Sequence, residues 1–410
     1  MKELILLGAG ASIEAGIPGA YDMTKKILNL FEKIYYDRRS FDVLRFVVGG
    51  LLFRNGVAGQ DPFQGVNVED LFNAVDLLAN RHSLEATPFI NAWHHRVDDL
   101  ERELLSRSDI DRVKNALYAD LSHDLSRKLR RGFLANSPID EGISKAFESL
   151  SSYGRYSSDN LSREIESIYD RLQKSPGGYI FQDTSLKMIQ KLKSIVWLED
   201  MSRVLYLNDL VTFAEKHCLT IATLNYDNCI ELCAEGLGAV VDTGIETWSK
   251  SGNFDLRQDG IRLLKLHGSI DWKLEDSPVS KDRPYPNKIL SKVTTLTNEK
   301  SAYRPALIFG QRNKLTAEGP FLDLLRGFQE SLEQTKLLTV IGYSFRDDHI
   351  NEFIGLWLNG NPNRKLRIFN GESFMKEPTP FIRQLSHVAE NRIVLSGKRA
   401  SDAIRECYGK

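Results

Sequence analysis

Short apolar runs that end abruptly at glycine, serine, asparagine or aspartate recur in this 410-residue chain. A parallel β-sheet covered on both faces requires strands of this kind, apolar throughout and punctuated where they end. Seven runs have this form and an eighth is weaker: 4–10, 219–227, 239–244, 262–269, 306–310, 337–344 and 365–370, with 392–396 as the weaker one. These runs predict the fold class α/β, with a Rossmann-like parallel sheet flanked by helices.

The stretch between about residues 45 and 215 has a different pattern. Apolar residues recur there at spacings of three and four, which is typical of amphipathic helices, in 68–80, 89–105, 111–131 and 185–217. We therefore expect 46–214 to be a large inserted all-helical module. Residues 1–45 together with 215–410 are then the predicted α/β domain, and 276–304 an extended excursion within it.

The first apolar run ends in Gly8-Ala9-Gly10-Ala11-Ser12, and Gly16-Ile17-Pro18 follows shortly after. Small residues let a backbone bend sharply after a strand, so its amides can approach a pyrophosphate. A helix opening behind the bend would add unpaired N–H groups and the positive end of its dipole. The spacing lacks the third glycine of the usual dinucleotide fingerprint, and many tight turns share it.

Composition excludes some classes of function. The formal net charge is −1, so no global basic field exists to hold nucleic acid or an anionic membrane, and only a local patch could do so. No apolar run reaches membrane-spanning length, and the start MKELILLGAG lacks the features of a cleaved signal. We therefore expect a cytoplasmic protein. Because no CxxC pair is present, we interpret the four cysteines as reduced thiols, and expect no zinc: Cys218, Cys229, Cys233 and Cys407.

Polar clusters follow four of the predicted strands. Ligands of parallel α/β sheets bind beyond the carboxyl ends of the strands, so these clusters are the candidate site. They are Thr223-Leu224-Asn225-Tyr226-Asp227, His267-Gly268-Ser269, Gly342-Tyr343-Ser344 with Asp347 and Asp348, and Asn370-Gly371-Glu372.

Each cluster also has a purely structural alternative. Asn225 and Asp227 could cap a helix that begins at Asn228, and Ser344 and Asp347 equally resemble an N-cap and a first-turn acid. Asn370-Gly371 could be a plain turn. The acidic pair Glu69-Asp70 should begin a helix, and it could also face the site from the inserted module.

Together with GAGAS and GIP, the ordered set of clusters resembles the sirtuin family. The family's marks are GAGxSxxxGIP, a T-x-N-x-D turn, a His-Gly pair, a G-x-S turn and a late Asn after a strand, and all five occur here in order. Two departures argue against protein deacylation: Leu224 stands where deacylases carry Gln, and their two zinc-binding CxxC pairs are absent. The patterns TLNYDN, LHGSIDW and IGYSFRDDHIN look instead like the sirtuin-like NAD hydrolases of bacterial anti-phage defence.

This resemblance implies NAD as the substrate and gives each matching residue a role. Asn225 would position the ribose or the attacking water, His267 would accept a proton, and Asp227 would fix the turn or orient Asn225. Ala9, Gly10 and Ser12 would hold the pyrophosphate, Ser344 a ribose or phosphate oxygen, and Asn370 the adenosine ribose. The remaining implied NAD-binding residues are Gly8, Ala11, Gly16, Ile17, Pro18, Thr223 and Gly342.

The resemblance also implies partners, since such hydrolases depend on restraint. Many form large assemblies, or act beside a HerA-type hexameric DNA translocase or a short Argonaute. We therefore expect a homo-oligomer and a partner protein that senses invasion. Two other functions stay open on the sequence: an NAD-dependent protein deacylase, and a non-catalytic scaffold that binds ADP-ribose or a nucleotide within a defence complex.

Overall fold

The computed structural model describes residues 2–34, 37–59, 65–81, 179–254, 259–277, 288–293, 305–308 and 319–409. Two compact units divide the chain: Met1–Val75 with Thr184–Lys410, and Asp76–Asp183. The predicted helices 89–105 and 111–131 lie outside the described residues. The predicted limits of the helical module, 46 and 214, stay a prediction.

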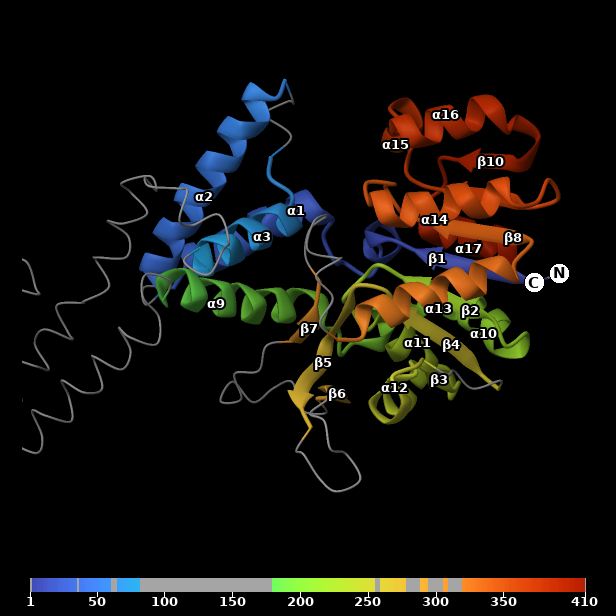
Figure 1. Cartoon of the computed structure of the whole chain (residues 1–410), viewed down its shortest axis with the longest axis horizontal. Coiled ribbons are helices and arrows are strands. Elements are labelled where there is room, and N and C mark those ends of the chain that lie inside the picture. Colours follow the sequence, from blue (N-terminus) through green and yellow to red (C-terminus); the bar gives the residue numbers. More distant parts are fainter. Residues whose placement is uncertain are drawn as a thin grey trace, which may run out of the picture. The chain divides into compact units, whose positions relative to one another are not determined.

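A seven-stranded parallel sheet lies in the first unit, with the strand order β10-β9-β8-β1-β2-β4-β3 (Figure 1). The predicted α/β class is therefore confirmed. β1 lies at the centre, between β2 and β8, so the strand order changes direction beside it. The strands are β1 (Glu3–Leu7), β2 (Thr220–Thr223), β3 (Val241–Asp242), β4 (Ile261–Lys265), β8 (Leu337–Ile341), β9 (Lys365–Phe369) and β10 (Ile393–Ser396).

A second sheet of three antiparallel strands contains β5 (Gly268–Asp276), β6 (Lys288–Lys292) and β7 (Pro305–Leu307), in the order β6-β5-β7. The prediction that the run 306–310 joins the parallel sheet is wrong, because β7 pairs with β5. The predicted excursion 276–304 contains β6. Gly268, at φ +80°, lets the chain leave β4 and turn into β5.

Helices flank the parallel sheet (Figure 1), and the prediction of a helix at 68–80 is confirmed by α3. The predicted helical stretch 185–217 is interrupted, since the Asp200 side chain accepts a hydrogen bond from Ser202 N and starts a 3-10 turn. The elements are η1 (Ala9–Ser12), α1 (Ala20–Glu32), α2 (Arg38–Val57), α3 (Val68–Ala79), α9 (Tyr179–Val196), η6 (Met201–Leu207), α10 (Asn208–Lys216), α11 (Cys229–Leu237), α12 (Ile245–Ser251), α13 (Phe321–Glu333), α14 (Asp348–Asn359), α15 (Glu372–Lys376), α16 (Pro380–Val388), η8 (Glu390–Arg392) and α17 (Ala400–Tyr408). None of the helices described combines the length and the apolar character needed to cross a membrane.

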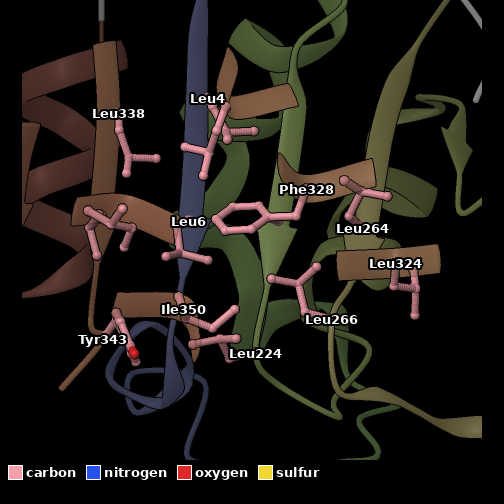
Figure 2. Close-up of a cluster of buried hydrophobic side chains, with 14 of the residues drawn as sticks. Leu4, Leu6, Leu224, Leu264, Leu266, Leu324, Phe328, Leu338, Tyr343 and Ile350 are labelled. Carbon is pink, nitrogen blue, oxygen red and sulfur yellow. The ribbon is translucent and has the colours of Figure 1, made fainter. Parts of the chain in front are cut away.

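Both faces of the sheet are buried at its central strands. On one face Leu4 and Leu6 of β1 join a cluster with Phe328 of α13 and Ile350 of α14 (Figure 2). Ile5 alternates with these residues along β1, so it points to the other face, and it is fully buried as well. Uninterrupted apolar strands are required for this reason, as the sequence pattern predicted.

The bends after β1 and β8 are in direct backbone contact. Gly8 N donates to Ile341 O at 2.9 Å, and Gly10 N donates to Gly342 O at 2.8 Å. A Cβ on Gly342, which has φ +70°, would lie 2.2 Å from Ala11 N, and a Cβ on Gly8 would lie 2.5 Å from the Cα of Tyr343. These glycines are therefore needed because two backbones approach each other too closely for any side chain.

A buried lysine ties β4 to the segment after β2. The Lys265 side chain has no exposed surface, and its Nζ donates to Asp227 O at 2.6 Å and to Glu231 Oε1 at 2.8 Å. Burial by itself lowers the pKa of Lys265, but Glu231, Asp271 and Asp227 together outweigh it and raise the pKa above its usual 10.5. Lys265 is therefore charged at neutral pH, and it holds the carbonyl of Asp227 in place.

We expect Gly342→Ala to lower the free energy of unfolding by about 3 kcal/mol or more, because the new methyl group meets backbone at a positive φ. Gly49→Ala is the matched control: this exposed glycine of α2 has open space where a Cβ would stand. The control should be neutral or stabilising by roughly 0.5–1 kcal/mol, since alanine favours a helix. Urea unfolding measures both, and equal effects would contradict the close approach.

We expect Lys265→Met to destabilise the protein by roughly 3–5 kcal/mol at pH 7, because it leaves carboxylates buried without their cation. A raised folded-state pKa stabilises below the unfolded pKa, so this difference should shrink as pH rises through the folded-state pKa. Lys25→Met removes an exposed pair with Asp22 and should change stability by less than about 1 kcal/mol. A small effect of Lys265→Met in denaturant titrations would refute a structural role for this ammonium.

Candidate active site

The carboxyl ends of β1, β2, β4, β8 and β9 lie at one edge of the parallel sheet, because every strand pair is parallel. All four predicted polar clusters and the first glycine-rich bend follow these strands directly. The topology therefore brings together, at one sheet edge, residues up to about 360 positions apart in the sequence.

The first bend differs from its prediction. The element behind it is η1, four residues of 3-10 helix, and α1 begins only at Ala20. The expectation of a helix opening directly behind the bend is wrong, because the backbone of Gly8 and Gly10 is bonded to the β8 turn. The backbone amides of Gly8, Gly10 and Ala11 each donate to a carbonyl oxygen. Ala9 is the exposed residue of this bend.

Asn225 connects β2 to this bend. Its side chain is buried, and its Nδ2 donates to Gly8 O at 3.0 Å and to Ser12 Oγ at 2.9 Å. The backbone N of Asn225 donates to Thr223 Oγ1 at 3.1 Å. The two Nδ2 bonds use both side-chain amide hydrogens, so Oδ1 is the atom with which Asn225 could bind a hydroxyl group or a water.

Asp227 bonds the start of α11 and also lines a pocket. Its Oδ1 accepts a hydrogen bond from the backbone N of Cys229, the first residue of α11, at 3.1 Å, although the N-cap residue of α11 is Asn228. It also lines a small pocket beside Asn225. The lining residues are Leu7, Ala11, Ser12, Leu207, Thr223, Asn225, Asp227, Cys229, Ile230 and Glu231.

The cysteines of the site region are thiols with little acidity. Burial, followed by the Asp227 carboxylate, raises the pKa of Cys229, and burial raises the pKa of Cys233 to about 12. All four cysteines are free. Among the residues that the structure describes, no group of three or more His, Cys, Asp or Glu side chains could hold a metal ion.

His267 is buried at the end of β4 and pairs with Asp347. Its Nε2 lies 3.1 Å from Asp347 Oδ2, and the two side chains are 6% and 8% exposed. Gly268 follows because a Cβ there would stand 1.9 Å from Ala306 O. The glycine of the His-Gly pair is thus explained by the antiparallel pairing of β5 with β7.

A contact between Tyr226 and Glu69 was missed in part by sequence reasoning. Tyr226 Oη lies 3.0 Å from Glu69 Oε1 and 3.1 Å from Ile308 O, and its ring centroid lies 6.2 Å from that of His267. Burial, and next the Glu69 carboxylate, raise the pKa of Tyr226 well above its usual value. Glu69 lies in the first turn of α3 and also faces the site region, so both readings of the acidic pair apply to it.

The turns after β8 and β9 hold each other. Asn370 Nδ2 donates to Tyr343 O at 2.8 Å, and Asn370 Oδ1 accepts from Gly371 N at 3.1 Å, as expected for the turn alternative. Ser344 is exposed in the turn after β8. It stands between the buried residues Tyr343 and Phe345, which anchor this turn.

The GIP segment lies beside Ser12 rather than beside His267. Ile17 is buried, and its amide donates to Ser12 O at 3.2 Å, while Pro18 is half-buried. Gly16 has φ +79° and is exposed, and a Cβ there would meet the Arg203 guanidinium at 2.5 Å. The structure therefore brings Ser12, Thr223, Asn225 and Asp227 together around one pocket, places His267 just after the neighbouring strand β4, and leaves Gly16 exposed.

Comparison with known proteins gives a family for part of the chain. Residues 219–394 match the sequence model of the SIR2-like domain. This range contains Asn225, His267, Asp347 and Asn370, whereas the bend after β1 precedes it. A search of curated proteins found no match.

Solved structures similar to this chain are distant from it. Sir2Tm bound to a propionylated peptide is 16% identical, with 55% of this chain and 78% of that chain covered and a TM-score of 0.32. A Sir2 homolog–NAD complex is 14% identical, with 56% and 72% covered and a TM-score of 0.32. A structure from work on sirtuin substrate affinity is 12% identical, with 99% and 92% covered and a TM-score of 0.34. By this match, residues 219–394 of this protein are similar to the SIR2-like domain.

Proposed function

We propose that this protein is an NAD⁺ hydrolase that cleaves the nicotinamide–ribose bond, with Asn225 and His267 as catalytic residues. One observation carries the proposal. Asn225 and His267 follow the neighbouring parallel strands β2 and β4, and Asn225 is hydrogen-bonded to Gly8 and Ser12 of the first bend. The SIR2-like match over residues 219–394 supports NAD as the substrate.

Cleavage of the nicotinamide–ribose bond depends more on orienting the ribose and the water than on activating the leaving group. A water oxygen attacks C1′ of the nicotinamide ribose, and the electron pair of the C1′–N bond leaves with nicotinamide, whose cationic ring becomes neutral. The proton released by the water passes to His267. Because nicotinamide is a good leaving group, rate acceleration comes from placing the ribose and the water and from stabilising the developing positive charge.

Each group available at the edge suits one part of this reaction. Asn225 Oδ1 accepts a hydrogen bond from the water or from a ribose hydroxyl, since its Nδ2 is engaged. Asp227 fixes the turn through Cys229 N. Ser12 and the exposed Ala9 would hold the pyrophosphate, while Gly10 would contribute by close backbone approach, since its amide is bonded to Gly342 O.

Ser344, Asn370 and the GIP segment complete the proposed NAD site. Ser344 is accessible at the end of β8, where it would bind a ribose or phosphate oxygen. Asn370 holds the adjoining turn and would bind the adenosine ribose. Gly16, Ile17 and Pro18 close the loop onto Ser12, and so would confine the substrate from that side.

We further propose that the reaction depletes NAD in the cytoplasm during anti-phage defence. Unregulated hydrolysis would poison the host, so the resting enzyme must be restrained. A homo-oligomer, together with a partner such as a HerA-type DNA translocase or a short Argonaute, would provide that restraint. The net charge of −1 favours a protein partner as the sensor of invading nucleic acid.

The full chain, incubated with NAD alone, should release nicotinamide and ADP-ribose in equal amounts, measured by liquid chromatography. Addition of an acetyl-lysine peptide should not raise the rate, because no acyl acceptor is needed for attack by water. Strict dependence on the peptide would contradict hydrolysis and favour a deacylase. The same assay with the co-expressed neighbouring gene product tests restraint by a partner.

Asn225→Ala and His267→Ala should each lower the hydrolysis rate by at least about 100-fold, which is the usual contribution of such groups. His387→Ala, on an exposed position of α16, is the matched control and should retain full activity. Thermal unfolding of each variant must accompany the assay, since Asn225→Ala also removes two buried hydrogen bonds. Unchanged NAD levels and phage protection in both variants, with assembly intact, would favour a non-catalytic scaffold.

A further inference from the structure

We propose that Asp347 is a positioning residue for His267: it holds Nε2 as the protonated nitrogen and so makes Nδ1 the basic atom of the neutral ring. This inference rests on the proposed hydrolase function, in which His267 accepts the proton released by water. Asp347 lies 80 residues from His267 in the sequence, and the two meet only because β4 and β8 end at the same sheet edge.

The carboxylate of Asp347 divides its two oxygens between two tasks. Oδ1 accepts a hydrogen bond from His349 N at 3.2 Å and caps α14, while Oδ2 lies 3.1 Å from His267 Nε2. The helix cap therefore aims the second oxygen at the ring. An N-cap role needs only a short side chain with an acceptor oxygen, which Asn, Ser or Thr also provide.

Tyr343 and Asn351 hold the backbone of Asp347. Tyr343 Oη lies 3.1 Å from Asp347 O and 3.2 Å from Asp347 N, and it also contacts Asn351 Oδ1 at 3.0 Å. Asn351 N donates to Asp347 O at 2.9 Å, and Asn351 Nδ2 donates to Phe345 O at 3.0 Å. The side chains of Tyr343, Asp347 and Asn351 are all buried, so the backbone that carries the carboxylate is held on both its N–H and C=O sides.

The chemistry of the pair determines which ring nitrogen carries hydrogen. An ionised carboxylate only accepts hydrogen bonds, so His267 must donate from Nε2, and in the neutral ring the other nitrogen then carries the lone pair. When His267 takes up a proton, the imidazolium formed is paired with the Asp347 carboxylate. Since both side chains are less than a tenth exposed, water screens this attraction only weakly.

Asp347→Asn separates the two tasks of the residue. Asparagine keeps the acceptor that caps α14, but it replaces the carboxylate facing His267 by a group that can donate through its NH₂. We therefore expect the variant to remain folded and to shift His267 toward the tautomer protonated at Nδ1. For hydrolysis we expect kcat to fall by roughly 100-fold or more, with KM changed by less than about threefold, because His267 rather than NAD binding is affected.

The test uses the full chain with ¹⁵N-labelled histidine, whose ring signals report the tautomer directly. His267→Gln identifies the His267 signals by their loss. Asp200→Asn is the matched control, since Asp200 is also an N-cap aspartate that accepts from a backbone amide, Ser202 N, but is exposed. This control should leave both the His267 signals and kcat unchanged.

Opposite outcomes separate the inference from the proposed function. A His267 ring protonated at Nδ1 in the wild type, or an unchanged ring signal in Asp347→Asn, would overturn the positioning role whatever the activity. A wild-type ring protonated at Nε2 that shifts in Asp347→Asn, in a protein that never hydrolyses NAD, would support the pairing and refute the hydrolase. A higher KM in Asp347→Asn with kcat unchanged would also overturn the proposal.

Discussion

The hydrogen bond from Gly10 N to Gly342 O joins the two bends on which the candidate site depends. It forms because Gly8, Gly10 and Gly342 have no side chains, so the backbones after β1 and β8 can touch. β1 and β8 flank the place where the strand order changes direction, where a parallel sheet offers its crevice. The glycines of the first bend therefore support the site mainly by close packing of backbone.

Asn225 and Asp347 extend that junction to the remaining strands. Asn225 links the end of β2 to the first bend through hydrogen bonds to Gly8 and Ser12. Asp347 links the turn after β8 to His267, which follows β4. Lys265, two residues before His267, donates a hydrogen bond to the backbone carbonyl of Asp227. The candidate catalytic residues are thus placed by buried polar contacts between strand ends, and each contact uses a different strand.

Much of the first unit could be predicted from local pattern. The runs at 4–10, 219–227 and 337–344 became parallel strands because a strand buried on both faces must be apolar throughout, a property visible in any short window. The run 306–310 has the same composition, yet its strand pairs with β5 in an antiparallel sheet. Apolar character indicates burial, but not the partner or its direction. The helix expected behind the first bend failed for a related reason, since the amide of Gly10 donates to Gly342 O, a contact that local sequence does not reveal.

By itself, the sequence determined the α/β class, the strand ends, the residue types at those ends and the resemblance to sirtuins, because each is written in residues that are neighbours in the chain. Tertiary structure alone decided which of these residues meet: Asn225 with Ser12, His267 with Asp347, and Tyr226 with Glu69. These partners lie 213, 80 and 157 positions apart. Their pairing follows from strand order and from the burial of polar groups that must find partners, and neither is encoded at any single position.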